Sequence, residues 1–265
     1  NILVGTIIAS FQASAVSYLY YADRIYQINL AIAGIAIGVV VLPQLSKYIQ
    51  QKKKKNIILI QNKALELSMF LSIPAAAALL IGSEKIISAL FGYGSFSEEG
   101  VYNSAKALYF FALGLPAFSL IKVFSSFLFA RHNTIIPFYF SIISVLINVG
   151  ISLYYFKDIG FIIIPIATSI SSWTNAFILF LYLNYKKYFF LKFRLIASLL
   201  KITLVTAISS YIFYYLIGTF SNNLTYDSKY KILFIILAVI ITISSYILIS
   251  IVTKAFKMSD IKLKY

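Results

Sequence analysis

The chain has 265 residues, of which 61% are hydrophobic and only 12% are charged, with a mean hydropathy of +0.89 and a formal net charge of +15. A soluble domain of this length does not tolerate such a composition, which is typical of a membrane protein. The absence of cysteine excludes disulfides, thiol catalysis and cysteine metal sites, and the single histidine, His132, leaves little for an imidazole metal site.

Eight apolar segments follow one another along the chain, and several reach the ~20 residues that a helix needs to cross a bilayer core of ~30 Å. In chain order they cover residues 1–13, 15–47, 57–82, 99–131, 135–156, 160–185, 195–218 and 230–253. Pro43, Pro74, Gly114 and Pro116 interrupt three of them, and in membrane helices such residues permit close packing or a bend. The sequence therefore predicts an all-α, polytopic transmembrane helix bundle.

The positive charge is concentrated after every second segment. Basic residues follow the second, fourth, sixth and eighth segments: Lys47, Lys52 to Lys55, Arg131, Lys186, Lys187, Lys192, Arg194, Lys254, Lys257, Lys262 and Lys264. By the positive-inside rule, residues 48–56, 186–194 and 254–265 are cytoplasmic, and residues 83–98, 157–160 and 219–229 are periplasmic. We attribute the net charge to this topology, so we expect no nucleic-acid partner. The mixture of basic and aromatic residues in 187–194 predicts a short element lying on the inner leaflet.

Asp23 and Arg24 lie beside an almost uncharged run that extends to Leu42. An arginine within a membrane helix costs about 2.5–3.5 kcal/mol unless it faces protein or water, so such a residue indicates a functional site, here for a bound anion. The alternative is an arginine near a helix end that extends to the lipid headgroups. Lys122, deep in the fourth segment, is the second candidate and has the same alternative.

Five short motifs carry a resemblance to a known family: Ser17–Arg24, Gly34–Gly38 with Leu42–Ser46, Phe91–Phe96, Gly114–Pro116 with Lys122–Phe124, and Phe129–Arg131. Together they resemble the eighth helix, the loop before the tenth helix, and the tenth helix of the MurJ (MviN) family of lipid II flippases. The similarity covers nearly the whole chain.

The resemblance implies a MATE-like fold of the MOP exporter superfamily, with fourteen transmembrane helices, in the bacterial cytoplasmic (inner) membrane. This chain corresponds to its last seven or eight helices, so we interpret it as a fragment whose N-terminal half is missing. Residues 1–194 are expected to form the C-terminal core repeat, helices seven to twelve. Residues 195–265 are expected to form two additional helices, which make a lipid-facing groove for the prenyl tail, and a cytoplasmic tail.

The resemblance further implies translocation of lipid II, the undecaprenyl-diphosphate-linked disaccharide pentapeptide, between leaflets by alternating access during peptidoglycan synthesis. Exporters of another prenyl-diphosphate-linked polysaccharide, such as O-antigen, or of cationic drugs remain alternatives in the same superfamily. A drug antiporter should show a buried carboxylate, whereas the intramembrane charge here is mainly cationic. An enzyme needs convergent histidines or carboxylates, which the sequence does not offer, so we predict none.

The family pattern assigns roles to individual residues. Arg24 matches a cavity arginine that would pair with the diphosphate, and Asp23 matches an acidic neighbour that orients the helix or the arginine. Ser17, Lys122 and Arg131 match further positions of this site.

No cofactor is expected, and no metal site is predicted. Asn148 and Thr168 could occupy two positions of a family sodium site, but Gly5 stands where its carboxylate would be. Gln27 stands where relatives have glutamate, which weakens any proton-linked role of that position.

Overall fold

The computed structural model is a bundle of long α-helices joined by short connections. It describes the backbone of residues 2–255 and the side chains of residues 4–31 and 41–255, and no strand occurs within these ranges. In chain order the helices are α1 (Ile2–Ala9), α2 (Ala15–Gln50), α3 (Lys54–Phe91), α4 (Glu98–Phe129), α5 (Ile135–Ile159), α6 (Ile163–Tyr185), α7 (Phe193–Thr219) and α8 (Lys231–Val252). Each predicted segment overlaps one of these helices, and the prediction of an all-α polytopic bundle is confirmed.

Five helical stretches within the described residues are long and apolar enough to cross a membrane, as judged by length and composition. They are α3, α4, α5 together with α6, α7, and α8. The helix α2 contains residues 32–40, whose side chains lie outside the described ranges, and the glycine motif Gly34–Gly38 falls there. The predicted cytoplasmic tail likewise lies outside the description beyond Ala255.

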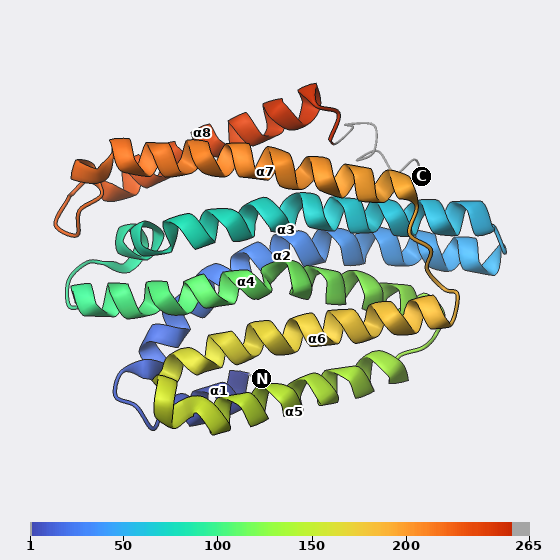
Figure 1. Cartoon of the computed structure of the whole chain (residues 1–265), viewed down its shortest axis with the longest axis horizontal. Helices are drawn as coiled ribbons and strands as arrows, with labels where there is room; N and C mark the ends of the chain where they lie inside the picture. Colours follow the sequence, from blue (N-terminus) through green and yellow to red (C-terminus); the bar gives the residue numbers. More distant parts are fainter. Residues whose placement is uncertain (1, 256–265) are drawn as a thin grey trace.

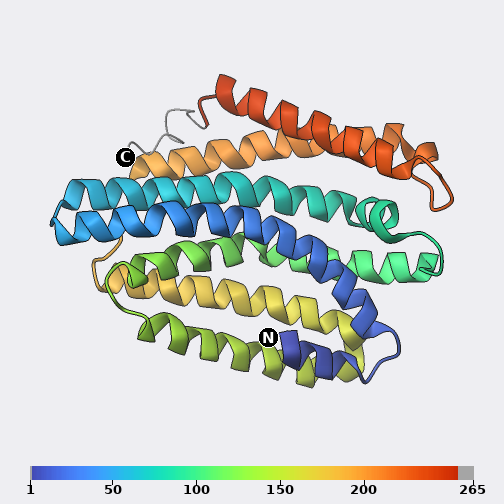
Figure 2. The same ribbon diagram turned by 180° about the vertical axis from the view of Figure 1, so that it is seen from behind.

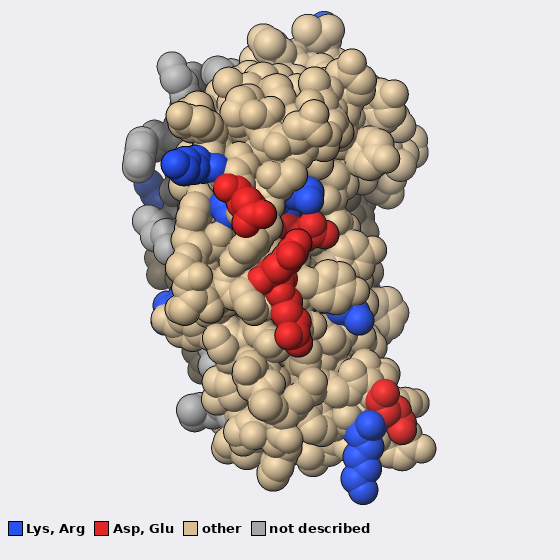
Figure 3. Space-filling model, turned by 90° about the vertical axis from the view of Figure 1, so that its left-hand side faces the viewer, with Lys and Arg blue, Asp and Glu red and all other residues tan. Residues whose placement is uncertain are grey.

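The connections alternate between two opposite ends of the bundle. The α2–α3, α4–α5 and α6–α7 connections and the end of α8 share one end, and the remaining connections share the other (Figures 1 and 2). We call the first the basic end, because most lysines and arginines of the connections lie there, and the second the acidic end. Figure 3 faces the acidic end and shows carboxylates gathered across it. These carboxylates are Glu84, Glu98, Glu99, Asp158 and Asp227. Basic and acidic residues are thus separated between the two ends, as the positive-inside pattern predicts. The cytoplasmic location of the basic end remains a prediction.

The predicted boundaries were wrong at α3, which continues nine residues beyond position 82. Residues 83–98 were expected to be a loop, but the helix runs to Phe91 and only Gly92–Ser97 connects it to α4. The loss of apolar character at Glu84 and Lys85 suggested an end, yet these two side chains form an exposed 2.9 Å ion pair on the helix surface. The first residue that breaks the helix is Gly92.

The four helices that finish at the basic end share one capping geometry. One residue just beyond the end of each helix has a positive φ of 53–56°, and the residues concerned are Lys52, His132, Lys187 and Lys254. At α4, for example, Asn133 N–H donates to Leu128 O at 3.0 Å and His132 N–H to Phe129 O at 2.9 Å. These bonds form a Schellman motif, in which glycine is the usual left-handed residue. Lysine at this position places a cation beside the negative end of the helix dipole.

Helix α4 lies at the centre of the bundle, against α2, α3 and α6. One buried cluster surrounds Phe111 toward the acidic end, and a second surrounds Phe127 toward the basic end. A Cβ atom at Gly114 would approach Ser169 Oγ to 2.8 Å and Ser169 Cα to 3.1 Å, so glycine permits the close contact of α4 with α6. Helices α7 and α8 form an outer layer on α3 (Figure 1).

Candidate functional site

One face of α2 turns away from the packed core and carries Arg24. Ser17, Tyr20, Arg24 and Ile28 are all exposed, and their spacing of three or four residues places them on a single stripe of the helix. Ala22, on the opposite side, is fully buried. The sequence pattern thus presents Arg24 and Ser17 together on a surface that the described chain does not cover.

The guanidinium of Arg24 has no carboxylate within ion-pairing distance among the described residues. Its carbon lies 4.6 Å from the centroid of the Tyr20 ring, one turn earlier on the stripe, in a cation–π contact. The neighbouring Asp23 instead accepts a hydrogen bond from the Gln27 side chain. The guanidinium donors are therefore open to an anionic ligand, whereas the Asp23 carboxylate is bound by Gln27, one turn later on the same helix.

Tyr26, which the sequence analysis did not single out, fixes the rotation of α2 against α4. Its ring is only 4% exposed and lies 5.4 Å from the Phe111 ring in a stacked arrangement and 5.5 Å from the Phe118 ring edge-on. Aromatic contacts of this kind are worth roughly 0.5–1.5 kcal/mol beyond the area that they bury. With Tyr26 locked inward, Arg24 two residues earlier is directed outward.

Lys122 is exposed on α4, one turn after Phe118. It lies seven residues before the end of α4, about 10 Å from the basic end, whereas Arg24 lies nine residues into α2, about 14 Å from the acidic end. No hydrogen bond or ion pair joins the two side chains in the described part of the chain. The candidate cations thus occupy two levels along the bundle axis.

Arg131 lies apart from the other predicted site residues. Its guanidinium donates to Phe127 O at 2.6 Å and to Tyr188 O at 3.0 Å, and lies 4.6 Å from the centroid of the Tyr188 ring. Burial lowers the pKa of the Arg131 guanidinium from its usual value, and the nearby Tyr188 opposes this shift. These contacts hold the α6–α7 connection against the end of α4.

The α6–α7 connection is anchored to the bundle near Phe189, while most side chains of residues 187–194 are exposed, so the short element on the inner leaflet remains a prediction. Residues 188–192 are non-helical, and Phe189 is fully buried between aromatic rings of α4 and α6. Two buried α3 amides fasten the backbone: Gln61 Nε2 donates to Tyr188 O at 2.9 Å and Asn62 Nδ2 to Phe190 O at 3.1 Å. The adjacent polar residues Gln61 and Asn62 in an otherwise apolar helix are the sequence signal that could have indicated this contact.

A seam of neutral polar side chains joins α5 to α6. Asn148 Nδ2 donates to Thr168 Oγ1 at 3.0 Å, and Ser144 Oγ donates to Ser171 O at 2.9 Å. A Cβ atom at Gly5 would lie 3.2 Å from Ile164 Cγ2, so the α1 position faces an apolar side chain. The described residues contain no cluster of three or more histidine, aspartate or glutamate side chains suited to a metal ion.

Comparisons with known proteins agree on one family. Residues 1–236 match the family model described as "Lipid II flippase MurJ". The chain is 43% identical over 180 residues to a "Probable lipid II flippase MurJ" of Rhizobium meliloti (strain 1021), an alignment that covers 68% of this chain and 34% of that protein. It is 35% identical over 182 residues to the protein of the same name from Rickettsia prowazekii (strain Madrid E), with 69% and 36% covered.

A solved structure extends the similarity to the fold. The structure titled "Lipid II flippase MurJ, inward closed conformation" superimposes with a TM-score of 0.77 at 26% sequence identity, covering 94% of this chain and 50% of that one. The chain thus spans about a third of the length of these curated relatives and half of the solved chain.

Proposed function

The chain belongs to the lipid II flippase MurJ family, and from this premise we propose that it forms the C-terminal half of a multi-pass inner-membrane transporter that flips lipid II. The relatives carry the name of a transporter. The cargo combines a diphosphate and peptide carboxylates with a prenyl tail. Its head therefore needs a hydrated cationic path, while its tail can remain near lipid.

The observation that carries this proposal is the exposed stripe of α2. Arg24 presents a guanidinium without a carboxylate partner among the described residues, on a face that also offers the Ser17 hydroxyl. A guanidinium can bind two diphosphate oxygens through parallel hydrogen bonds, which a single ammonium cannot do. In the proposed protein this face lines a cavity shared with the N-terminal half.

Lys122 supplies a second cation nearer to the basic end. We propose that the diphosphate contacts Lys122 and Arg24 at different stages of the transport cycle, because the two lie at different levels along the axis. Asp23, bonded to Gln27, keeps its carboxylate on α2 and away from the anion. Arg131 contributes indirectly, by holding the α6–α7 connection.

The outer layer provides a surface for the prenyl tail. Leu204 and Tyr211 on α7 and Leu248 on α8 are 65%, 70% and 63% exposed. These exposed side chains of α7 and α8 support the proposal that the two additional helices form a lipid-facing groove beside the core repeat 1–194.

The alternative cargo is another prenyl-diphosphate-linked polysaccharide, since Arg24 and Lys122 would recognise the same diphosphate. The experiment that separates the two is reconstitution of the full-length protein in lipid vesicles that contain either lipid II or an undecaprenyl-diphosphate-linked O-antigen unit. The head group that reaches the outer leaflet is then counted with an impermeant modifying reagent. We expect transport of lipid II to exceed transport of the O-antigen unit; equal or reversed rates would reject the assignment.

A further inference from the structure

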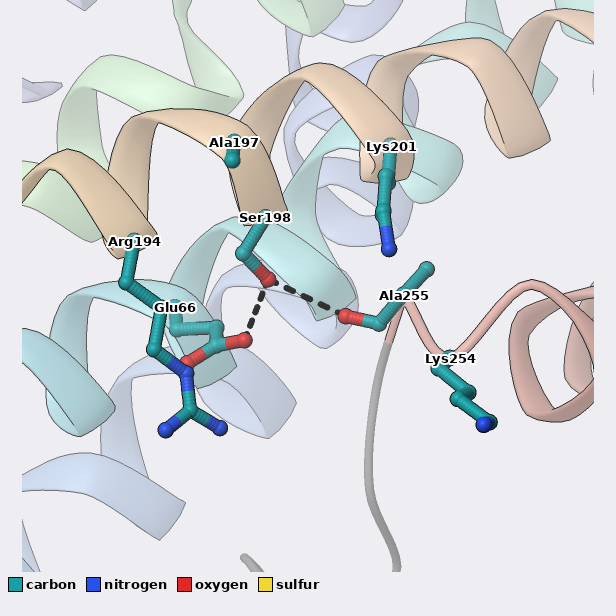
Figure 4. Close-up of a pocket in the computed structure, with 7 residues that line it drawn as sticks. All are labelled: Glu66, Arg194, Ala197, Ser198, Lys201, Lys254 and Ala255. Atoms are coloured by element: carbon teal, nitrogen blue, oxygen red, sulfur yellow. Dashed lines mark hydrogen bonds between the residues drawn. The ribbon is translucent and has the colours of Figure 1, made fainter.

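A cavity of about 280 Å³ lies at the basic end, between α3, α7 and the residues that end α8. Figure 4 shows its lining residues, which are Glu66, Arg194, Ala197, Ser198, Lys201, Lys254 and Ala255. None of them lies on α2 or α4, which carry Arg24 and Lys122. The cavity is therefore separate from the proposed transport path.

The α7 side of the cavity is a single stripe of four residues. Arg194, Ala197, Ser198 and Lys201 follow the i, i+3, i+4, i+7 spacing of one helix face. The two small residues in the middle leave space between the two long cations. The pattern of a cation, two small residues and a cation therefore forms a concave basic surface.

The end of α8 adds a third cation. A Schellman motif turns the chain after Thr253: Lys254 has φ 53°, and Ala255 N–H donates to Ser250 O at 3.0 Å. Two contacts from α7 lie at this turn: Lys201 Nζ donates to Thr253 O at 3.3 Å, and Ser198 Oγ lies 3.0 Å from Ala255 O. Lys254 is thus placed at the cavity by backbone geometry.

The cavity carries an excess of positive charge. Glu66 is the only carboxylate among the described residues that line it, and it accepts a hydrogen bond from Ser198. None of the three cations forms an ion pair within the described residues, so three positive charges face one negative charge. Such an arrangement favours an anion that several cations can contact together.

The surroundings of the cavity are apolar. Tyr246 of α8 donates to Phe70 O at 2.9 Å and, with Val205 and Ala255, forms a buried cluster beneath the cavity. Next to the lining residues in the sequence, Leu200 on α7 is 61% exposed and Val252 on α8 is 80% exposed, so both helices carry apolar side chains suited to lipid. An anion bound here could therefore extend an acyl chain along α7 or α8.

We propose that this cavity binds a phosphate group, and that the group is the headgroup phosphate of an anionic phospholipid. The Arg194 guanidinium and the two ammonium groups contact the phosphate oxygens, and the acyl chains lie against the exposed apolar faces of α7 and α8. The basic end, which we predict to be cytoplasmic, faces the leaflet in which anionic lipids attract such cations. The bound lipid joins α7 to the end of α8 at the side of the outer layer.

The test compares two charge-matched variants of the full-length protein in detergent. Lys201→Gln with Lys254→Gln removes two cations of the cavity, whereas Lys54→Gln with Lys55→Gln removes two exposed cations at the same end of the bundle. Binding of phosphatidylglycerol with a fluorescent acyl chain is titrated for each. We expect the affinity to fall by about fivefold for each cavity cation removed and to change little in the control.

Equal losses in the two variants would show general attraction to a basic surface and would overturn the proposal. Displacement of the lipid by an equal concentration of inorganic phosphate would overturn the assignment to a lipid headgroup. If the cavity variant does not fold, Ala197→Cys provides a second measurement, since this chain contains no cysteine. In a background without other cysteines, phosphatidylglycerol should slow modification of this thiol several-fold more than phosphatidylcholine does; equal rates would reject the site.

Discussion

The ammonium group of Lys231 donates a 2.6 Å hydrogen bond to the carbonyl oxygen of Gly92, 139 residues earlier in the chain. A second 2.6 Å bond reaches Tyr226 O, and the rings of Tyr93 and Tyr226 lie 4.3 and 4.8 Å from the same nitrogen. Lys231 is only 1% exposed. This cage fastens the start of α8 to the α3–α4 connection and thereby joins the outer layer to the core at the acidic end.

Replacing Lys231 should destabilise the contact between α8 and the core. Lys231→Met keeps an unbranched side chain but leaves two carbonyl groups without their donor, which should cost about 2 kcal/mol. We expect the full-length protein to unfold several degrees lower when followed by tyrosine and tryptophan fluorescence. Lys229→Met, an exposed position two residues away, is the matched control. Identical melting of both variants would show that the cage adds no stability.

The sequence predicted the helices well because apolar runs and membrane length constrain them strongly. It predicted contacts between distant segments less well, as Lys231 shows: nothing in the sequence linked this lysine to Gly92, 139 residues earlier. The contacts of segment 187–194 were missed for a related reason. Its alternation of basic and aromatic residues suits a membrane surface, and most of its side chains are exposed, but the buried amides of Gln61 and Asn62 also bind its backbone from α3.

The candidate site was predicted in part. The spacing of Ser17 and Arg24 was sufficient to place both on one helix face, and the structure presents them together. Arg131 could not be separated from this group by sequence, because its partner Tyr188 lies 57 residues away. Tyr26 carried no distinguishing signal among the 21 tyrosines of the chain.

The separation of charge between the two ends predicts the orientation in the membrane. Single cysteines at Lys157 and Asn222, exposed at the acidic end, should react with an impermeant maleimide added to intact cells. Cysteines at Lys54 and Lys186, exposed at the basic end, should react only after the cells are opened. Equal labelling at positions 54 and 222 in intact cells would contradict the assigned orientation.

The Schellman end of α4 predicts a stabilising substitution at His132. Its φ of 56° lies in the left-handed region, which costs a residue with a Cβ atom roughly 1–2 kcal/mol. His132→Gly should remove part of this cost and raise the free energy of unfolding by about 0.5–1 kcal/mol, measured by thermal unfolding of the full-length protein. His132→Ala retains the Cβ atom and should give no gain; a gain of the same size with alanine would reject the backbone explanation.

The exposed position of Lys122 predicts that charge matters more than side-chain length. Lys122→Arg in the full-length protein should support growth of cells depleted of their own flippase better than Lys122→Met does. Both variants should reach normal levels in the membrane, because the side chain is exposed on α4 and makes no side-chain hydrogen bond within the described residues. Indistinguishable growth with both would assign Lys122 to the lipid headgroup interface instead.

Arg24 provides the most direct test of the proposed transport path. If its guanidinium binds the diphosphate, Arg24→Ala should reach the membrane at normal levels yet fail to rescue flippase-depleted cells, because a neutral side chain is easier to accommodate in a membrane helix than a cation. Arg24→Lys should rescue partially at best, since an ammonium keeps the charge but loses the paired donors. Lys106→Ala, which removes another exposed cation, is the control and should rescue fully. Full rescue by Arg24→Ala at normal expression would reject the binding of the diphosphate by Arg24. Loss of the protein from the membrane would instead indicate a structural pair with Asp23. A double variant in which the charges of Asp23 and Arg24 are swapped should then restore the protein.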